Sequence, residues 1–400
     1  MAFSQVGSNI TGSSSFGKAV SLSSDGTVIA IGADSSEYVA IYAFESGSWQ
    51  QRGSNISGEA ASNFFGGAVS LSSDGNTVAI GATNNDGGGS DSGHVRIYNW
   101  DGTSWSQLGA DIDGSAAHDR SGFSVSLSND GSIVAIGANE NTGIDGSDNG
   151  YTRIFEWNSG TSSWDQLGAD IDGASNYYYA GSSVALSEDG QTIAIGTPGS
   201  NSPGNGAGHT SIYNWNGSSW SQIGANITGE AAGDASGADE TVAISNDGTI
   251  VAIGAQNNDG TGDNAGHTRV YKWDGSSWTQ LGSDIDGEAA GDRSGSVSLS
   301  ANGEILAIGA WQNDGGGSNS GHVHIYRLVS GSWVKTGDDI DGLGVNDYAG
   351  FSVSLSEDGN TLAVGTGVNE NYVQVFDLGL DFTAPTFSSA ATNTDGTKVV

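Results

Sequence analysis

The sequence lacks cysteine altogether and has only three prolines, one methionine and 11 lysines and arginines among its 400 residues. Without cysteine, disulfides cannot report the redox compartment of the protein. No segment approaches the roughly 18 consecutive apolar residues of a membrane-spanning helix. Residues 1–9 have neither the basic region nor the apolar run of a signal peptide, so none is expected.

The few basic residues stand against 46 aspartates and glutamates, which gives a formal net charge of −35. A charge of this sign repels phosphate backbones and anionic membranes, so neither nucleic acid nor membrane insertion is expected. Multivalent cations, cationic surfaces and neutral glycans remain as partners. The composition is rich in Ser, Thr, Asn and Gly and poor in Lys, which is typical of an extracellular or cell-surface location.

The sequence does contain one pattern that repeats from end to end. Seven units carry a glycine at the same place, about 50 to 60 residues apart: Gly17, Gly67, Gly122, Gly181, Gly237, Gly295 and Gly350. In the third unit, Phe123, Val125 and Leu127 alternate with serines, as in a strand with one buried face. An Asn-Asp-Gly turn at 129–131 then predicts a tight hairpin into the apolar run 133–136.

Two further strands are predicted in each unit, at 151–157 and 164–167 in this one, so each unit is a four-stranded antiparallel meander. Seven such sheets bury both faces when they are arranged radially, which predicts an all-β fold, a seven-bladed β-propeller. Residues 1–12 match the fourth-strand segment 220–229 of a later unit, whereas the last unit ends after its third strand at 372–378. We therefore expect the N-terminal strand to close the last blade and remove two exposed sheet edges.

The extent of the repeat defines the domain organisation. Residues 1–379 are predicted to form the propeller. Residues 380–400 have the character of a linker followed by the truncated start of another module.

Three features of the repeat resemble a known family. They are Phe-Gly or Ser-Gly at the start of the unit (Phe16-Gly17, Ser121-Gly122), Gly-Ala at the end of the second strand (Gly81-Ala82, Gly137-Ala138, Gly254-Ala255, Gly309-Ala310), and Gly-x-Val-x-Ile-Tyr in the third strand (Gly93 to Tyr98, Gly321 to Tyr326). The pattern is similar to FG-GAP repeats, the units of integrin α-subunit propellers and of many bacterial surface proteins. Residues 381–400 resemble the opening strands of bacterial Ig-like modules of large adhesins. The resemblance implies adhesion or recognition at a surface.

The integrin type of this family has a calcium loop between the first two strands, which is reduced here to Ser-Asp-Gly or Asn-Asp-Gly. Because calcium takes six to eight oxygen ligands, we do not carry that site over. Another carboxylate set precedes each new unit as Asp-Ile-Asp-Gly with a later Asp. The sets are Asp111, Asp113 and Asp119; Asp284, Asp286 and Asp292; Asp339, Asp341 and Asp347; and the incomplete pair Asp170 and Asp172.

Alternating acids before a glycine form half of a calcium loop, so calcium is the cofactor that these sets predict. The alternative is that the side chains accept hydrogen bonds from backbone N–H groups of the turns. The absence of the bidentate Glu that closes a complete calcium loop favours this alternative.

A meander places the loops between strands two and three on the same face as the connections to the next blade. These loops are long in units two to six, which predicts a binding surface over those blades. Tyr177, Tyr178 and Tyr179 on this face replace polar residues of the other units, and Trp311 replaces Thr, Asn or Gln. Such rings suit stacking on a sugar or anchoring of a protein partner. The alternative is that they fill the groove between blades.

Two other recurrent residue types are assigned to the scaffold. Gly-His pairs supply one histidine to each of four blades (His94, His209, His267, His322). We therefore expect these histidines to lie far apart around the propeller and not to bind one common ion. Paired tryptophans flank the turn between strands three and four, and their recurrence at one position of the repeat predicts that they serve blade packing.

No nucleophile, base and orienting group stand out as a set, so we expect no enzyme. Arg96, Arg153 and Arg269 recur at one position of separate blades and do not converge as in sialidase propellers. The sequence therefore predicts a non-catalytic binding or adhesion module of a larger secreted or surface protein, with a glycan or protein ligand. The alternative is a structural or receptor-binding component of a virion or extracellular assembly.

Overall fold

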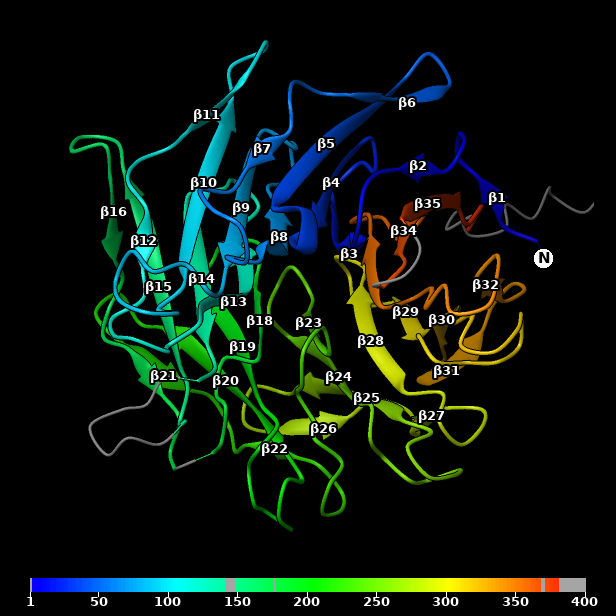
Figure 1. Ribbon diagram of the computed structural model, residues 1–400. Helices are drawn as coiled ribbons and strands as arrows, with labels where there is room; N and C mark the ends of the chain where they lie inside the picture. Colours follow the sequence, from blue (N-terminus) through cyan, green and yellow to red (C-terminus); the bar gives the residue numbers. More distant parts are fainter. Residues whose placement is uncertain (1, 141–147, 176, 368–370, 381–400) are drawn as a thin grey trace, which may run out of the picture.

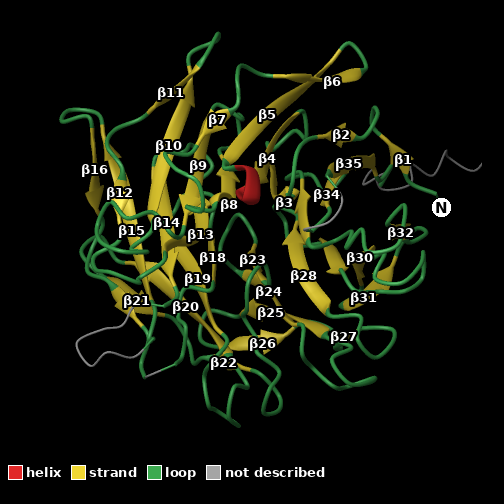
Figure 2. Cartoon of the chain, viewed as in Figure 1, coloured by secondary structure: helices red, strands yellow, loops and turns green. Residues whose placement is uncertain are grey.

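The computed structural model describes residues 2–140, 148–175, 177–367 and 371–380. They form seven antiparallel sheets that follow one another around a central axis (Figure 1). The rest is almost entirely loop (Figure 2), and the helix of the described residues is the 3₁₀ turn η1 (Asp34–Ser36). Within these ranges, no helix has the length and apolarity to span a membrane. The predicted all-β, seven-bladed propeller is confirmed.

Blade three shows how the repeat folds. The innermost strand β13 (Ser121–Leu127) pairs with β14 (Ile133–Ala138), which pairs in turn with β15 (Tyr151–Asn158). The fourth strand is interrupted, because β16 (Ser163–Gln166) and β17 (Ile171–Asp172) pair with opposite ends of β15. The predicted four-stranded meander is therefore correct, with a break in its outer strand.

The other blades repeat this order. Their bounds are as follows: blade one, β3 (Phe16–Leu22), β4 (Val28–Ala33), β5 (Tyr38–Glu45), β6 (Ser48–Gln51) and β7 (Ile56–Ser57); blade two, β8 (Phe65–Leu71), β9 (Thr77–Ala82), β10 (His94–Trp100), β11 (Trp105–Gln107) and β12 (Ile112–Asp113); blade four, β18 (Ser183–Leu186), β19 (Thr192–Thr197), β20 (His209–Trp215), β21 (Trp220–Gln222) and β22 (Ile227–Thr228); blade five, β23 (Val242–Ile244), β24 (Ile250–Ala255), β25 (His267–Trp273), β26 (Trp278–Gln280) and β27 (Ile285–Asp286); blade six, β28 (Ser294–Leu299), β29 (Ile305–Ala310), β30 (His322–Val329), β31 (Ser332–Lys335) and β32 (Ile340–Asp341).

Blade seven combines the two ends of the described chain. It contains β33 (Ser352–Leu355), β34 (Thr361–Gly365) and β35 (Tyr372–Asp377). Its fourth strand comes from the N-terminus, where β1 (Ser4–Gln5) and β2 (Ile10–Thr11) pair antiparallel with β35. The predicted closure of the ring is thus confirmed, and Figure 1 shows β1 and β2 beside β35.

The hydrophobic core lies between neighbouring blades. One cluster joins Val95 and Ile97 of blade two to Val134, Ile136 and Phe155 of blade three. Every residue of β14 is buried, as its continuous apolar run predicts. Each fully buried aliphatic side chain contributes about 1.5–3 kcal/mol to the free energy of folding, so these apolar layers are the main contacts that hold the blades together.

Leu380, just beyond the predicted boundary at residue 379, packs into the cluster of blades six and seven. The predicted linker and Ig-like start at 381–400 lie outside the described residues.

Glycines of neighbouring blades touch around the axis, which explains why the repeat needs two of them. A Cβ on Gly81 would lie 2.0 Å from the carbonyl oxygen of Gly122, and all seven blade pairs repeat this close approach. In blade two the residue in this contact is Gly66, which faces Gly32 and has a φ of +92°. The prediction that Gly67 was the repeat marker is therefore wrong by one residue, because the doubled glycine concealed which of the two takes the left-handed conformation.

The tryptophans serve blade packing, as predicted, and they also link neighbouring blades at the rim. In each of six blades a fourth-strand tryptophan donates its indole N–H to the backbone of the preceding blade at 2.8 to 3.0 Å. The acceptors are Val6, Arg52, Leu108, Leu167, Ile223 and Leu281. The indoles therefore tie each blade to its neighbour at the rim.

The turns between first and second strands form one face of the ring, here named the turn face. In blade three, Asp130 accepts hydrogen bonds from the Ser128 hydroxyl and the Ser132 N–H, at 2.8 and 2.9 Å. Successive turns are joined by a closed circle of backbone N–H to C=O bonds of 2.8 to 2.9 Å. The circle runs through Ser24, Ser73, Asn129, Glu188, Asn246, Ala301 and Glu357 and back to Ser24.

Candidate functional site

The opposite face, here named the loop face, carries the long loops and the connections between blades. In blades two to six the residue before the third strand forms a parallel bridge with the connection to the next blade. The pairs are Gly93 with Ser121, Gly150 with Ala180, Gly208 with Ser236, Gly266 with Ser294, and Gly321 with Ala349. The predicted arrangement of loops and connections on one face is correct, and the connections hold these loops in place.

The first aspartate of each predicted metal set is held by a side chain four residues before it. Gln107 donates to Asp111 at 2.6 Å, Gln280 to Asp284 at 2.5 Å, and Lys335 to Asp339 at 2.6 Å. Asp170 is held in the same way by Gln166 at 2.7 Å. Asp111 also accepts two hydrogen bonds from Arg96, at 3.0 and 2.8 Å. Burial acts to raise the pKa of Asp111, but the bonds from Arg96 and Gln107 outweigh it and lower the pKa.

The last aspartate of each set is buried and hydrogen-bonded within the protein. Each accepts a bond from the backbone N–H three residues before it: Ala116 to Asp119 at 2.8 Å, Ala289 to Asp292 at 2.9 Å, and Gly344 to Asp347 at 2.7 Å. A side chain supplies a second bond: Tyr151 to Asp119 at 3.0 Å, Asn313 to Asp292 at 2.9 Å, and Tyr372 to Asp347 at 2.6 Å. These carboxylates thus fasten the blade connection to the third strand or the long loop.

The middle aspartates Asp113, Asp286 and Asp341 are exposed, and each lies opposite a histidine of the third strand. Among the described residues, three groups bring metal-ligand atoms within 4.8 Å of one another: Glu59, His94 and Asp111; Glu230, His267 and Asp284; and Glu288, His322, His324 and Asp339. The structure therefore joins the first aspartate of each set to histidine and glutamate instead of to the other two aspartates. Calcium binding by the sets stays a prediction.

The four Gly-His histidines lie in separate blades, as predicted. Burial lowers the pKa of His209 to about 4, and burial together with the charge of His324 lowers that of His322 to about 4. These rings are therefore neutral at neutral pH. His324 was not predicted as part of a site, although it stands two residues after His322 and therefore lies on the same face of a strand.

The three consecutive tyrosines of blade four have different surroundings. Tyr177 is 60% exposed. The ring of Tyr178 packs edge-on against His209, with 6.4 Å between centroids, and the Tyr179 ring lies against Gly199. Tyr177 is thus exposed, whereas Tyr178 and Tyr179 are half-buried against residues of their own blade.

Trp311 lies at the loop-face end of β29, in an aromatic cluster with two residues of blade seven. Its ring centroid lies 5.7 Å from that of Tyr348 and 5.6 Å from that of Phe351. The guanidinium of Arg293 lies 5.9 Å from the Trp311 ring, and the ammonium of Lys18 lies 4.0 Å from the Phe351 ring. We name these five residues the mouth cluster, because Phe351 and Lys18 follow the glycines that surround the axis.

Blade five departs from the repeat beside this cluster. Four residues separate Gly237 from Val242, where two separate Gly17 from Val20 in blade one. The inserted residues include Asp239 and Glu240, which line a cavity of about 90 Å³ together with first-strand residues of other blades. An acidic pair thus projects into the central channel from one side.

The channel raises the pKa of its acidic pair. Burial, and then the negative charge of Asp239, raise the pKa of Glu240 to about 8, while the positive charge of Lys18 acts against this rise. Ser352 of blade seven donates to Glu240 at 3.5 Å. The acidic pair is therefore close to the mouth cluster. It was not predicted from the sequence, although the two extra residues in blade five mark its position.

The arrangement combines flat rings, cations held over rings, amides and a partly protonated acid at the axis. Such groups can stack on and hydrogen-bond to a ligand. Arg96 is bound to Asp111, Arg153 donates to the backbone of Asp113, and Arg269 donates to that of Thr228. These arginines occupy separate blades and do not converge on one ligand.

No family model matches the chain, and no curated protein matches it. Solved structures do resemble it. Hydrazine synthase of Kuenenia stuttgartiensis matches with a TM-score of 0.62 and 14% identity over 94% of this chain and 99% of that one. The Cps50 (Swd1) β-propeller domain of Myceliophteria thermophila matches with a TM-score of 0.61 and 12% identity over 94% and 99%. At these identities the likeness shows the propeller fold alone.

Proposed function

We propose that this propeller is a non-catalytic binding module of an extracellular or surface protein, and that it holds a glycan or a protein ligand on its loop face. The observation that carries the proposal is the mouth cluster, in which Trp311, Tyr348 and Phe351 pack together where blades six and seven meet, close to the acidic pair. Rings of this size supply large contact areas with little loss of conformational entropy, and they anchor many interfaces.

The charge of the face favours a neutral glycan or a basic segment of a protein. Asp239 and Glu240 lie at the axis, and the chain carries a formal net charge of −35. An anionic ligand would meet repulsion over the whole surface. Tyr177, with its exposed ring on the same face, is a second contact for a ligand that extends from the axis over blade four.

The resemblance to FG-GAP repeats supports adhesion as the role of this binding. The paired glycines of the repeat bring neighbouring blades into contact and leave the loops free to vary. Catalysis forms no part of the proposal, because the arginines that grip a substrate in sialidase propellers are dispersed here among blades two, three and five. Calcium is proposed only as an auxiliary ion of the Asp-Ile-Asp-Gly turns.

The test is binding of the purified protein to an array of neutral glycans and of basic peptides. We expect signals that Trp311→Ala reduces at least tenfold and Tyr177→Ala reduces less, because anchor residues commonly contribute about 2 kcal/mol or more. Val329→Ala, at an exposed end of β30, is the control and should change nothing. Equal binding by Trp311→Ala and the unaltered protein would contradict the proposal.

A further inference from the structure

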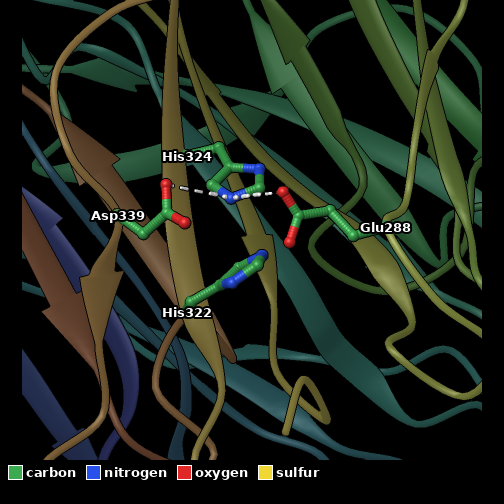
Figure 3. Close-up of side chains that lie close together, drawn as sticks. All are labelled: Glu288, His322, His324 and Asp339. Atoms are coloured by element: carbon green, nitrogen blue, oxygen red, sulfur yellow. Dashed lines mark ion pairs between the residues drawn. The ribbon is translucent and has the colours of Figure 1, made fainter. Parts of the chain in front are cut away.

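Four side chains that can ligate a metal converge on the outer half of blade six (Figure 3). The Nε2 atom of His324 lies 3.3 Å from Asp339 Oδ1 and 3.6 Å from Glu288 Oε1. The rings of His322 and His324 stack with 3.9 Å between their centroids. One ligand atom from each of the four residues lies within 4.8 Å of those of the others.

Blades two and five have a related group of side chains at the position equivalent to this site in blade six. Each has one histidine, one glutamate and one aspartate here, and an arginine at the position of His324. In blade two Arg96 forms ion pairs with both Glu59 and Asp111, so its guanidinium holds the two carboxylates together. Blade six replaces that arginine by a second histidine, and the glutamine of the fourth strand by Lys335.

The position of Lys335 shows that the converging ligands of blade six are directed at a cation. Its ammonium lies 2.6 Å from Asp339 Oδ1, 3.4 Å from Glu288 Oε1 and 3.0 Å from His324 Nε2. An ammonium has three donors and no acceptor, so His324 must present a lone pair to it. The same lone pair and the same two oxygens are what a metal ion would use.

The spacing of these atoms fits a first-row transition metal better than calcium. Ligands at about 2.0–2.2 Å around a tetrahedral zinc ion are about 3.3–3.6 Å apart. His324 Nε2 is already at this distance from Asp339, and close to it from Glu288. Imidazole ligands suit zinc and its neighbours, whereas calcium takes oxygen.

We propose that Glu288, His322, His324 and Asp339 form a binding site for a divalent transition-metal ion such as Zn²⁺, which enters when Lys335 turns out to solvent. The Lys335 side chain is 36% exposed, so it can leave without unfolding the blade. Glu288 and Asp339 are also partly exposed, which lets them close on the ion, whereas the two histidines are buried and fixed.

The ion would take over the role of Lys335, whose ion pairs now join Glu288 to Asp339. Glu288 belongs to the connection from blade five to blade six, the histidines lie on β30, and Asp339 precedes β32. A bound ion would therefore fasten this connection to the outer strands of blade six, at the edge of the loop face.

The experiment is equilibrium dialysis of the untagged protein against Zn²⁺, with Co²⁺ as a spectroscopic probe of the ligands. We expect one equivalent of zinc above the background of the swap variant His324→Arg/Lys335→Gln. That variant gives blade six the residues of blade two, so it should fold and keep the local charge. His322→Ala should weaken binding at least roughly 100-fold, because even outer-shell partners of a metal contribute about 10- to 100-fold.

Two further variants separate this site from general binding by an acidic surface. Lys335→Gln alone should tighten zinc binding roughly tenfold or more, because it removes a charge that competes for the same ligands. Arg269→His/Gln280→Lys should give blade five a second site with His267. Equal zinc binding by the unaltered protein and the swap variant, or an absorption spectrum of bound Co²⁺ without histidine ligands, would overturn the proposal.

Discussion

The two faces of the ring are built from the same repeat but have become different kinds of surface. The turn face is nearly uniform: each turn begins with a serine and has an aspartate or asparagine at its corner, and backbone bonds join all seven turns in a circle. The loop face is uneven, with long pinned loops in blades two to six, an acidic insertion in blade five and the mouth cluster between blades. The difference indicates that the turn face maintains the fold and that the loop face is free to acquire ligands.

The largest effect is expected for a glycine of the turn face. A Cβ on Gly131, whose φ is +69°, would lie 2.8 Å from the Cβ of Thr77 in the neighbouring blade. Gly131→Ala should lower the free energy of unfolding by about 3 kcal/mol or more, since the left-handed conformation alone costs about 1–2 kcal/mol and overpacking adds to it. Urea unfolding measures this.

Gly102→Ala is the matched control for that variant. Gly102 also has a positive φ, of +100°, but a Cβ there would meet no atom within 4 Å. It should cost only the conformational part, about 1–2 kcal/mol. Equal losses for the two variants would mean that contact between the blades is not what the turn glycine protects.

The next effect concerns Glu357, an acidic side chain that joins three turns of the turn face. Glu357 Oε1 accepts hydrogen bonds from Ser73 and Asn129, each at 2.6 Å. Glu357→Ala should cost about 2–3 kcal/mol, because it leaves both donors without this acceptor. Glu304→Ala, exposed on the same face, should change stability by less than about 0.5 kcal/mol. A loss for Glu357→Ala no greater than for Glu304→Ala would contradict the bridge.

On the loop face, a smaller and pH-dependent effect is expected at Glu240. Its pKa of about 8 in the folded protein lies above the ordinary glutamate value of about 4.3, so the folded state binds more protons between these limits. Stability should therefore fall as the pH rises from about 4.5 to about 8. Glu240→Gln should remove most of this slope and be more stable than the unaltered protein at pH 8.5.

Urea unfolding of both proteins across this pH range tests the effect. Asp239→Asn should reduce the slope in the same direction, since the charge of Asp239 is one cause of the raised pKa of Glu240. Parallel pH profiles for Glu240→Gln and the unaltered protein would show that the channel does not hold this acid in its protonated form.

The smallest effect is expected for calcium. If the Asp-Ile-Asp-Gly turns bind it, millimolar calcium should stabilise the protein by about 1 kcal/mol over EDTA, as for an ion present at several times its Kd. Replacing the exposed aspartates, Asp113→Asn/Asp286→Asn/Asp341→Asn, should abolish that gain without disturbing Asp111, which Arg96 already holds. If calcium stabilised the triple variant as much as the unaltered protein, these aspartates would not be its ligands.

The fold could be predicted from the sequence because the same local patterns recur in seven repeat units. Alternation at Phe123, Val125 and Leu127 predicted β13, the Asp130-Gly131 turn predicted the hairpin, and the match of residues 1–12 to a fourth strand predicted the closure. The break in the fourth strand was missed, because it depends on contact with tryptophans of the next blade, which no local pattern reports.

The sites were harder to predict, because they combine residues from segments far apart in the chain. Spacing alone grouped Asp339 with Asp341 and Asp347, whereas the structure groups it with His322, His324 and Glu288. Asp347 instead turns inward to a tyrosine of the next blade. Trp311 was identified because it breaks the repeat. The contact of Lys18 with Phe351 was not predicted, since blades one and seven are adjacent only in the closed ring.

The closure of blade seven also has a consequence for synthesis. Ser4 pairs with Asp377, so β1 leaves the ribosome long before β35, the strand with which it pairs. At about 5–20 residues per second, the delay is roughly 20 to 75 seconds. During that time six blades can stack, but the ring stays open between the first and the last. The pairing of β1 and β2 with β35 can therefore form only after the other six blades have been synthesised.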